Sequence, residues 1–472
     1  MIALDNVSYA YPFTSIPAVS GIDLRVRPGE AVLVTGPSGC GKSTLIRLVN
    51  GLCPHFFNGR LKGRVRVAGK DTTAYRLHEI SNQVGTLFQD PEHQFFAMTV
   101  AEEIAFVHEW RQTSPRAILK TVRTAAERFG LTHLLDRSLL HLSEGEKQKV
   151  VLASIVSCDP RILVLDEPTA NLDPEATADL AATIKAFKQA GMAILIVDHR
   201  LYWLESVVDR VLIMDRGRIA GDGSFSMLND VAVTSAHGLR KARLDDPRPR
   251  LKAADNRHSL LRVENLGFAY KSGPSLFHGA NINLAQGVTA LLGQNGSGKT
   301  TLARLLTGLS PMDSGRLYLG DQPIEARLLL NRASIILQNV DHQLHMKTVR
   351  EELIVSAQSI QQDLRESSVE EHLDRLGLRH LAERHPQSLS GGEKQRLVIA
   401  CGMIKQPDVL ILDEPTSGLD GRNMALVVGL VRRAADQGAC VVLISHDLEL
   451  IGAACDHALR LPLENEEHGF PS

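Results

Sequence analysis

The sequence has 472 residues, of which 44% are hydrophobic and 22% are charged, and its formal net charge is -2. This length exceeds what one hydrophobic core usually supports, and the composition is that of a globular protein rather than of a disordered or fibrous chain. The near-zero charge excludes a global basic field for nucleic acid, and the six scattered cysteines, without a C-x-x-C pair, argue against a zinc site or a disulfide framework.

The N-terminal segment MIALDNVSYAYPF alternates polar and apolar residues and does not resemble a signal peptide. We therefore expect the protein in the cytoplasm. The most apolar runs, such as ILVLDEP and VVLISHD, are far shorter than the roughly 20 residues that cross a bilayer, so any membrane link is expected to go through a partner.

A phosphate-binding loop follows the apolar run AVLVTG. Its pattern, G-x-x-x-x-G-K-S/T, predicts backbone N–H groups that wrap phosphates at the start of a helix. The loop consists of Gly36, Pro37, Ser38, Gly39, Cys40, Gly41, Lys42, Ser43 and Thr44. Lys42 is expected to reach the β- and γ-phosphates of ATP, and Ser43 to offer its hydroxyl to Mg²⁺.

Two adjacent carboxylates, Asp166 and Glu167, end the apolar run RILVLDEP. The aspartate can orient Mg²⁺ through water, and the glutamate can polarise a water molecule in line with the γ-phosphate. The structural alternative for such a pair is a place at a helix N-terminus, where acids favour the dipole. The next apolar run, AILIVDH, ends at His199.

The same series of motifs recurs in the second half of the chain. The repeated segments are GQNGSGKTT, ILQNVDHQ, LSGGEKQRL and LILDEPTSGLD, in the same order as their counterparts. The second P-loop consists of Gly293, Gln294, Asn295, Gly296, Ser297, Gly298, Lys299, Thr300 and Thr301, and the second acid pair is Asp413 and Glu414. This order indicates an internal duplication.

The apolar runs, each feeding a helical pattern, predict an α/β fold with a parallel sheet buried on both faces and active residues at the strand ends. We expect domain 1 over residues 1–228, a linker over 229–259, domain 2 over 260–463 and a tail over 464–472. The linker is charged and contains proline, which favours a solvated tether. Its basic cluster leaves a phosphate or lipid-headgroup contact as the alternative.

With these motifs the chain resembles the ATP-binding-cassette (ABC) proteins over nearly all of its length except linker and tail. The family feature is the LSGGQ-like signature, present as LSEGE at 142–146 and LSGGE at 389–393. The resemblance implies, for each half, a P-loop NTPase (RecA-like) core, an N-terminal antiparallel β subdomain and a helical signature subdomain. It also implies head-to-tail pairing, with each ATP between the P-loop of one domain and the signature of the other.

Carried over by position, the resemblance implies two composite ATP sites. The first P-loop would act with Tyr11, Gln89, Asp166, Glu167 and His199, opposite Ser390, Gly391 and Gly392. The second would act with Tyr270, Gln338, Asp413, Glu414 and His446, opposite Ser143 and Gly145.

The resemblance also assigns a role to each kind of residue in these sets. The tyrosines would stack on adenine, with a place in the core as the alternative. The glutamines would sense Mg²⁺ and the attacking water, and the histidines would contact the γ-phosphate. Asp173 and Asp420 resemble the loop that links the two sites.

Glu144 departs from the family pattern, because it stands where the signature usually has its first glycine. An unscreened carboxylate about 5 Å from the γ-phosphate would cost roughly 3 kcal/mol per phosphate charge at an effective dielectric near 20, and a solvated rotamer would remove most of that. We therefore hypothesise that the site with Lys299 and Glu414 hydrolyses ATP more slowly than the site with Lys42 and Glu167.

The segment FQDPEHQFFAMTVAEEIAF is similar to the energy-coupling factor (ECF) ATPases, as is the insertion NGLCPHFFNGRLKGRV. In the second half Val340 replaces the proline. The resemblance implies ATP-driven import of a vitamin or transition-metal ion from the cytoplasmic side of the cell membrane. It implies a transmembrane coupling protein and a substrate-binding membrane protein as partners, and no nucleic acid.

Two other functions stay open on the sequence. A soluble tandem ABC ATPase acting on ribosomes or nucleic acid usually has a long charged helical linker, a zinc module or a basic tail, and none is apparent. A fused-cassette ATPase of a sugar importer typically has a degenerate second P-loop, whereas GQNGSGKT is complete.

Overall fold

The structure is a computed structural model that describes residues 1–254, 259–271, 275–358 and 366–463. The chain forms two compact units, Met1–Arg243 and Leu244–Ser472. The boundary between them falls within the segment expected as linker. The expected tail, 464–472, and residues 255–258 of the expected linker lie outside the described residues.

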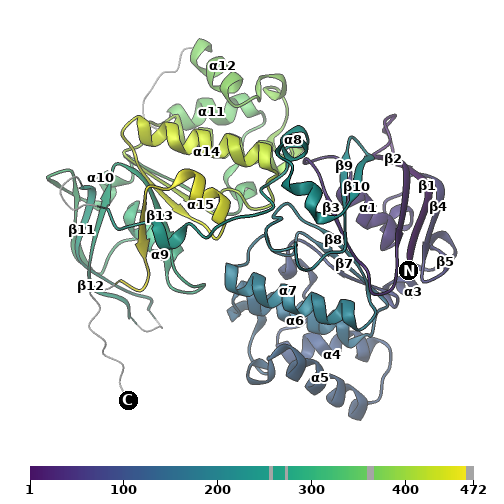
Figure 1. Ribbon diagram of the computed structural model, residues 1–472. Helices are drawn as coiled ribbons and strands as arrows, with labels where there is room; N and C mark the ends of the chain where they lie inside the picture. Colours follow the sequence, from purple (N-terminus) through teal and green to yellow (C-terminus); the bar gives the residue numbers. More distant parts are fainter. Residues whose placement is uncertain (255–258, 272–274, 359–365, 464–472) are drawn as a thin grey trace. The chain divides into compact units, whose positions relative to one another are not determined.

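The first unit begins with an antiparallel sheet whose strand order is β2-β1-β4-β5 (Figure 1). Its strands are β1 (Ile2–Ala10), β2 (Val19–Val26), β4 (Arg60–Val67) and β5 (Lys70–Asp71). Along β2, buried Ile22, Leu24 and Val26 alternate with exposed Asp23 and Arg25. This alternation is typical of an antiparallel sheet with one face on the core and one in water.

A second sheet forms the centre of the first unit, with the order β10-β9-β3-β8-β7-β6. The parallel strands are β3 (Ala31–Thr35), β6 (Val84–Leu87), β7 (Ile162–Asp166), β8 (Ala193–Val197) and β9 (Arg210–Asp215), and β10 (Arg218–Gly223) pairs antiparallel at the edge. Val32 and Val34 pack into one apolar cluster, and Ala31 and Leu33 into another. The sheet is therefore buried on both faces, as the uninterrupted apolar runs predicted.

The helices of the first unit belong to two groups. On the parallel sheet lie α1 (Lys42–Val49) and α7 (Pro174–Gln189), with the short helices α2 (Leu52–His55), α3 (Leu77–Ser81) and α8 (Val231–Ala236) elsewhere in the unit. Helices α4 (Val100–Trp110), α5 (Pro115–Phe129) and α6 (Glu144–Ser157) pack on one another as a helical subdomain with an apolar core of its own (Figure 1).

The second unit repeats this plan. Its antiparallel sheet, ordered β12-β11-β14-β15, contains β11 (Ser259–Ala269), β12 (Ser275–Ala285), β14 (Ser314–Leu319) and β15 (Gln322–Ile324). Its parallel sheet, ordered β16-β17-β18-β13-β19, contains β13 (Gly287–Leu292), β16 (Ala333–Ile336), β17 (Val409–Asp413), β18 (Cys440–Ile444) and β19 (His457–Arg460). The helices are α9 (Lys299–Leu306), α10 (Ala326–Leu329), α11 (Val349–Gln358), α12 (Glu366–Arg375), α13 (Gly391–Met403), α14 (Gly421–Asp436) and α15 (Leu448–Ala454). The predicted α/β fold is confirmed, and it is present in both units.

Several residues of the expected linker pack against one or the other unit, so this part of the segment is not a free tether. Leu239 and Ala242 pack into the apolar core of the first unit. In the second unit, Arg460 Nη2 donates to the backbone carbonyl of Arg248 at 2.7 Å and of Leu251 at 3.0 Å. The few apolar residues in this charged segment are thus enough to attach its described part.

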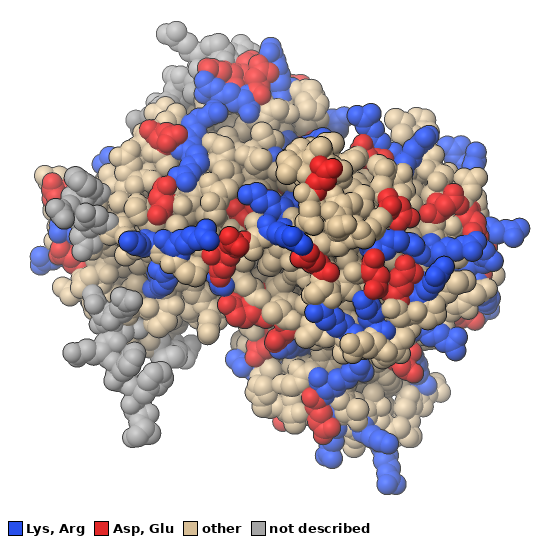
Figure 2. All heavy atoms as spheres, in the orientation of Figure 1, with Lys and Arg blue, Asp and Glu red and all other residues tan. Residues whose placement is uncertain are grey.

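The visible face of the molecule mixes Lys and Arg side chains with Asp and Glu, as Figure 2 shows. This mixture fits the formal net charge of -2. In the part of the chain that the structure describes, no helix is long and apolar enough to cross a membrane.

Candidate functional site

Three neighbouring parallel strands end together and bring the motifs of each half to one edge of the sheet. In the first unit β3 leads into Gly36, β7 ends at Asp166 and β8 is followed by His199. Since β7 pairs with β8 and β8 with β3, the P-loop, the acid pair and the histidine are adjacent. Strands β13, β17 and β18 do the same in the second unit. This edge is where ligands bind in open α/β sheets.

Each P-loop holds its lysine by two backbone carbonyls. Lys42 Nζ donates to the carbonyls of Gly36 at 2.9 Å and Pro37 at 3.0 Å. Lys299 Nζ donates to those of Gly293 at 2.8 Å and Gln294 at 2.9 Å. Both ammonium groups are therefore held inside the curve of the loop, where a lysine can pair with phosphate.

Glycine is required at the start of the first P-loop and again where the loop turns into α1. Gly36 and Gly41 have φ of 149° and 107°, and a Cβ on Gly36 would lie 2.1 Å from the Met214 carbonyl oxygen. Neither α1 nor α9 has a side-chain cap at its N-terminus. The first backbone N–H groups of each helix are thus available to an anion, as a phosphate site needs.

The two predicted adenine-stacking tyrosines lie beside the P-loop helices. The Tyr11 hydroxyl is 3.2 Å from Thr44 Oγ1, and the Tyr270 hydroxyl is 2.8 Å from Thr301 Oγ1. The Tyr11 ring also packs edge-on against Tyr9, with 5.1 Å between the ring centroids. Tyr270 is 52% exposed. The first ring thus belongs partly to the core, and the second presents more of its surface.

The acid pair of the first unit is half-buried, its histidine is buried and its glutamine is exposed. Gln89 Nε2 donates to Glu167 Oε2 at 3.1 Å, and His199 Nε2 lies 3.6 Å from Glu167 Oε1. Burial raises the pKa of Asp166 to about 6, despite the attraction of Lys42. Burial, together with the charges of Asp166 and Asp198, raises the pKa of Glu167 to about 8. The site therefore disfavours two ionised carboxylates at once, as is common for clustered acids at a functional site.

The acid pair of the second unit has different partners. Thr300 Oγ1 donates to Asp413 Oδ2 at 3.0 Å. Glu414 accepts hydrogen bonds from Ser445 Oγ and from the backbone N–H of His446, both at 2.9 Å. The His446 Nε2 atom lies 3.0 Å from Asn295 Oδ1 of the P-loop. Gln338 follows β16 at the place that corresponds to Gln89. The glutamate is thus held by hydroxyl and backbone donors in this half.

Sequence analysis missed a carboxylate that fixes the loop after each acid pair. Thr169 Oγ1 donates to Asp198 Oδ2 at 2.8 Å, and Thr416 Oγ1 donates to Asp447 Oδ2 at 2.7 Å. The aspartate precedes the histidine in the first half and follows it in the second. The exchange is visible when VDHR and ISHD are compared, but its meaning depends on the tertiary contact.

Arg240 also influences the site of the first unit, although it belongs to the segment expected as linker. It is 2% exposed. Burial, followed by the positive charges of Lys42 and Arg240, lowers the pKa of His199 well below its ordinary value of 6.5. His199 is therefore a neutral imidazole that can donate or accept a hydrogen bond.

Each signature begins a helix through a capping box. Ser143 caps α6 with Glu146, and Ser390 caps α13 with Glu393. This is the S-x-x-E pattern of a helix start, and it orients the first N–H groups of the helix outward. A Cβ at Gly391 would meet nothing within 4 Å. The corresponding position therefore has room for a side chain, which explains how Glu144 fits the fold.

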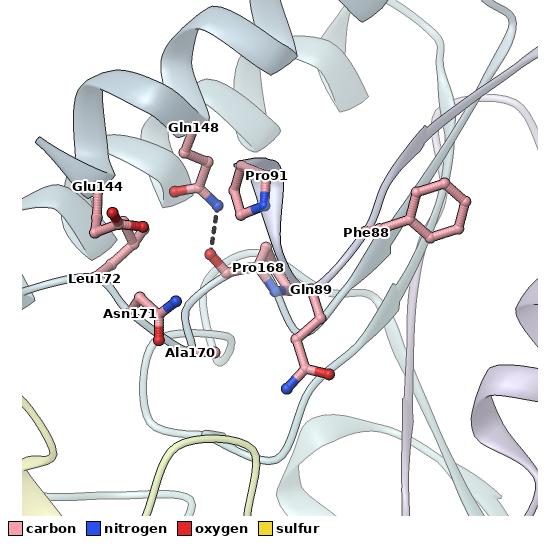
Figure 3. Close-up of a pocket in the computed structure, with 9 residues that line it drawn as sticks. All are labelled: Phe88, Gln89, Pro91, Glu144, Gln148, Pro168, Ala170, Asn171 and Leu172. Atoms are coloured by element: carbon pink, nitrogen blue, oxygen red, sulfur yellow. Dashed lines mark hydrogen bonds between the residues drawn. The ribbon is translucent and has the colours of Figure 1, made fainter. Parts of the chain in front are cut away.

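Glu144 is not a free carboxylate, in contrast to the assumption behind the estimated penalty. Its Oε1 atom lies 2.8 Å from Lys147 Nζ, one turn further along α6. Figure 3 shows Glu144 and Gln148 on this helix beside Gln89 and Pro168, with the Gln148 amide donating to the Pro168 carbonyl. Residues of the glutamine loop, the signature helix and the loop after the acid pair thus line one pocket.

The donor set fits a Mg²⁺ ion that binds together with a nucleotide. No cluster of three or more His, Cys, Asp or Glu side chains that could hold a metal occurs among the described residues. The second unit instead pairs one hydroxyl, Thr300, with one carboxylate, Asp413. Mg²⁺ is commonly held by one or two protein oxygens together with substrate phosphates and water.

Comparison with known proteins agrees with this geometry. Residues 19–170 and 277–417 match the family model described as ABC transporter. A putative ABC transporter ATP-binding protein of Treponema denticola is 36% identical over 472 residues, which cover 98% of this chain and 95% of the relative. The putative HMP/thiamine import ATP-binding protein YkoD of Bacillus subtilis is 32% identical over 496 residues, which cover 98% of this chain and 90% of the relative.

A solved structure titled RNase-L Inhibitor aligns with a TM-score of 0.64 over 97% of this chain and 87% of that one. The sequence identity is 20%, so this likeness shows the shared fold alone.

Proposed function

This chain belongs to the ABC transporter family of ATP-binding proteins, and we propose that its ATPase activity drives import of a small micronutrient, a vitamin or a transition-metal ion, through ECF-type membrane partners. The observation that carries the proposal is the exposed apolar segment directly after Gln89, the residue that contacts Glu167. The Bacillus subtilis relative, named a putative HMP/thiamine import ATP-binding protein, supports the same class of cargo. The chain would then lie at the cytoplasmic face of the cell membrane as a peripheral subunit.

The segment after Gln89 presents apolar side chains on a rigid support. Phe96 and Met98 are 73% and 67% exposed. The Phe96 ring stacks on Phe106 with 5.0 Å between ring centroids. The backbone N–H groups of Phe96 and Ala97 donate to the buried carboxylate of Glu103 at 2.9 and 3.0 Å. A fixed, exposed apolar segment next to a catalytic residue suits a partner that must respond to ATP.

The second half presents a polar version of this segment. His345 and Lys347 stand where Phe96 and Met98 stand in the first half, and both are exposed. The backbone N–H of Met346 donates to Glu352 at 2.6 Å, so the support is the same although the surface differs. Two unlike docking segments fit an asymmetric membrane partner.

The catalytic proposal follows from the first unit. Glu167 and Gln89, 3.1 Å apart, would position one water molecule, and Glu167 would accept its proton during attack on the γ-phosphate. Lys42 and the open N-terminus of α1 would stabilise the charge of the phosphoryl group. Neutral His199 would hydrogen-bond the γ-phosphate and so report its presence. Ser43, Gln89 and Asp166 would hold Mg²⁺ in the first half and Thr300, Gln338 and Asp413 in the second, where the ion would supply charge neutralisation of the phosphates.

We further propose that each site is completed by the opposite signature, Ser390 to Gly392 for the first and Ser143 with Gly145 for the second. Closure of the two halves on ATP would then move the docking segments.

The test is affinity purification of the tagged full chain from native membranes, followed by identification of the co-purifying proteins. The proposal expects integral membrane proteins, including one transmembrane coupling protein and one small substrate-binding protein. Recovery of ribosomes without membrane proteins would contradict it.

A further inference from the structure

Lys147 lies at the junction of the signature helix and the glutamine loop. It is only 7% exposed although it carries a charge. Its ammonium group lies 2.8 Å from Glu144 Oε1 and also pairs with Glu92, which belongs to the short helix Pro91–Gln94 after Gln89. Glu144 occupies the first turn of α6, so one cation holds the unusual signature residue and the docking segment together.

The two carboxylates determine the state of this buried cation. Burial acts to lower the pKa of Lys147, but the hydrogen bonds to Glu144 and Glu92 outweigh it and raise the pKa. Lys147 therefore stays charged in spite of its burial, and the penalty of a buried ammonium is offset by two partners.

In the second half, Lys394 corresponds to Lys147 but has one carboxylate partner, Asp341, instead of two. Lys394 Nζ lies 2.7 Å from Asp341 Oδ1 and 3.1 Å from the Gln387 amide oxygen. Gly391 stands in the position of Glu144 and has open space around it. The lysine is thus common to both halves, whereas the acid that it must neutralise at the signature is present in the first half alone.

The bond to Lys147 also neutralises Glu144. Lys147 is three residues further along α6, so the two side chains are neighbours on the helix surface, and the ammonium group 2.8 Å from Glu144 Oε1 places a positive charge directly beside this carboxylate. The first N–H groups of this helix are the part of a signature that an anion would approach. An unpaired carboxylate there would repel phosphate by an amount that corresponds to tenfold or more in affinity.

We propose that Lys147 is a positioning residue for the second ATP site, where it neutralises Glu144, so that LSEGE serves as a signature. The proposal rests on the head-to-tail pairing stated above, in which this signature completes the site of Lys299 and Glu414. Lys394 has no acid to neutralise at its signature, because Gly391 stands in the position of Glu144.

The experiment measures ATP hydrolysis by the full-length chain with one site inactivated at a time. Glu167→Gln leaves the second site active, and Glu414→Gln leaves the first. In the Glu167→Gln background, Lys147→Met is expected to lower kcat/KM for ATP tenfold or more, mainly by raising KM. Adding Glu144→Gly should restore kcat/KM to within threefold, because the uncompensated acid is then gone.

Lys394→Met in the Glu414→Gln background is the matched control, with an expected change below threefold. A merely structural role of Lys147 would lower kcat and the melting temperature together and would resist rescue by Glu144→Gly. Failure of that rescue, or an unchanged KM in Lys147→Met, would overturn the proposal.

An effect of Lys147→Met confined to the Glu414→Gln background would instead contradict the head-to-tail pairing and remove Lys147 from the second site. Whether membrane proteins co-purify has no bearing on any of these rates, so failure of the import proposal is recognised separately.

Discussion

His199 faces Glu167 with 3.6 Å between its Nε2 atom and the Oε1 atom of the carboxylate. In the second half the corresponding imidazole atom lies 3.0 Å from Asn295 instead, and Glu414 is held by Ser445 and the His446 backbone. The two acid pairs thus occupy equivalent strand ends but differ in what surrounds the glutamate. We therefore expect Glu167 and Glu414 to respond differently to the same substitution.

The first prediction concerns pH and stability. Burial raises the pKa of Glu167 from an ordinary value of 4.5 to about 8, so folding disfavours its ionised form. The resulting loss of stability is absent below about pH 4.5, grows as the pH rises towards 8, and is complete above that. Glu167→Gln should therefore stabilise the nucleotide-free chain at about pH 8.5, on the order of 2 kcal/mol, and clearly less at about pH 5.5.

Thermal unfolding of both proteins at the two pH values measures this effect. Glu414→Gln is the matched control, and it should stabilise less because the amide keeps only one of the two oxygens that accept hydrogen bonds from Ser445 and the His446 backbone. An equal gain from Glu167→Gln at both pH values would show that the Glu167 carboxylate is not the cause.

The second prediction concerns adenine binding. Because Tyr270 is 52% exposed, Tyr270→Ala should weaken ATP binding at the second site about three- to tenfold, the size of one stacking interaction. Tyr270→Phe keeps the ring and should bind ATP within twofold of the original chain. Equilibrium titration with a fluorescent ATP analogue distinguishes the variants, and identical affinities for Ala and Phe would exclude stacking.

The third prediction concerns the threonine–aspartate contacts. Thr169→Val removes the hydroxyl that donates to Asp198 at 2.8 Å and leaves a buried carboxylate with fewer donors. The free energy of unfolding should fall by about 1–2 kcal/mol in denaturant titrations. Thr416→Val should cost a similar amount through Asp447. If the aspartates were unimportant for the loop, neither substitution would change the midpoint.

The fourth prediction concerns the docking segment. Phe96→Asp with Met98→Asp places charges on exposed side chains and should abolish co-purification of membrane proteins while ATP binding stays intact. The control, His345→Asp with Lys347→Asp, changes a segment that is polar already and should retain partners attached through the first half. Unchanged recovery with the Phe96 and Met98 variant would show that the partner docks elsewhere.

The sequence could predict the fold and the placement of the motifs, because a strand, loop and helix in succession are local and each motif lies at a strand end. The P-loops, the acid pairs and the duplicated α/β plan belong to this class. Lys147 beside Glu144 could also have been read from the sequence, since the two are three residues apart on one helix.

Other contacts depend on tertiary structure. Glu92, in the glutamine loop, pairs with Lys147 on the signature helix. Asp198 and Thr169, which follow neighbouring strands, are joined by a hydrogen bond. Together with burial, the charge of Arg240, in a segment whose composition suggests a tether, lowers the pKa of His199. Lys147 supplies a counter-charge to Glu144, which reduces the repulsion of phosphate expected from an unpaired carboxylate at this position. The asymmetry that we hypothesised from Glu144 therefore depends on Lys147.

The most direct test of the account counts the ATP molecules that one chain binds. With Glu167→Gln and Glu414→Gln together, hydrolysis should stop, and equilibrium dialysis with radiolabelled ATP and Mg²⁺ should give two bound ATP per chain. Adding Lys42→Met or Lys299→Met should each remove one. A single ATP per chain, or two that persist in either lysine variant, would contradict the claim that both halves form complete nucleotide sites.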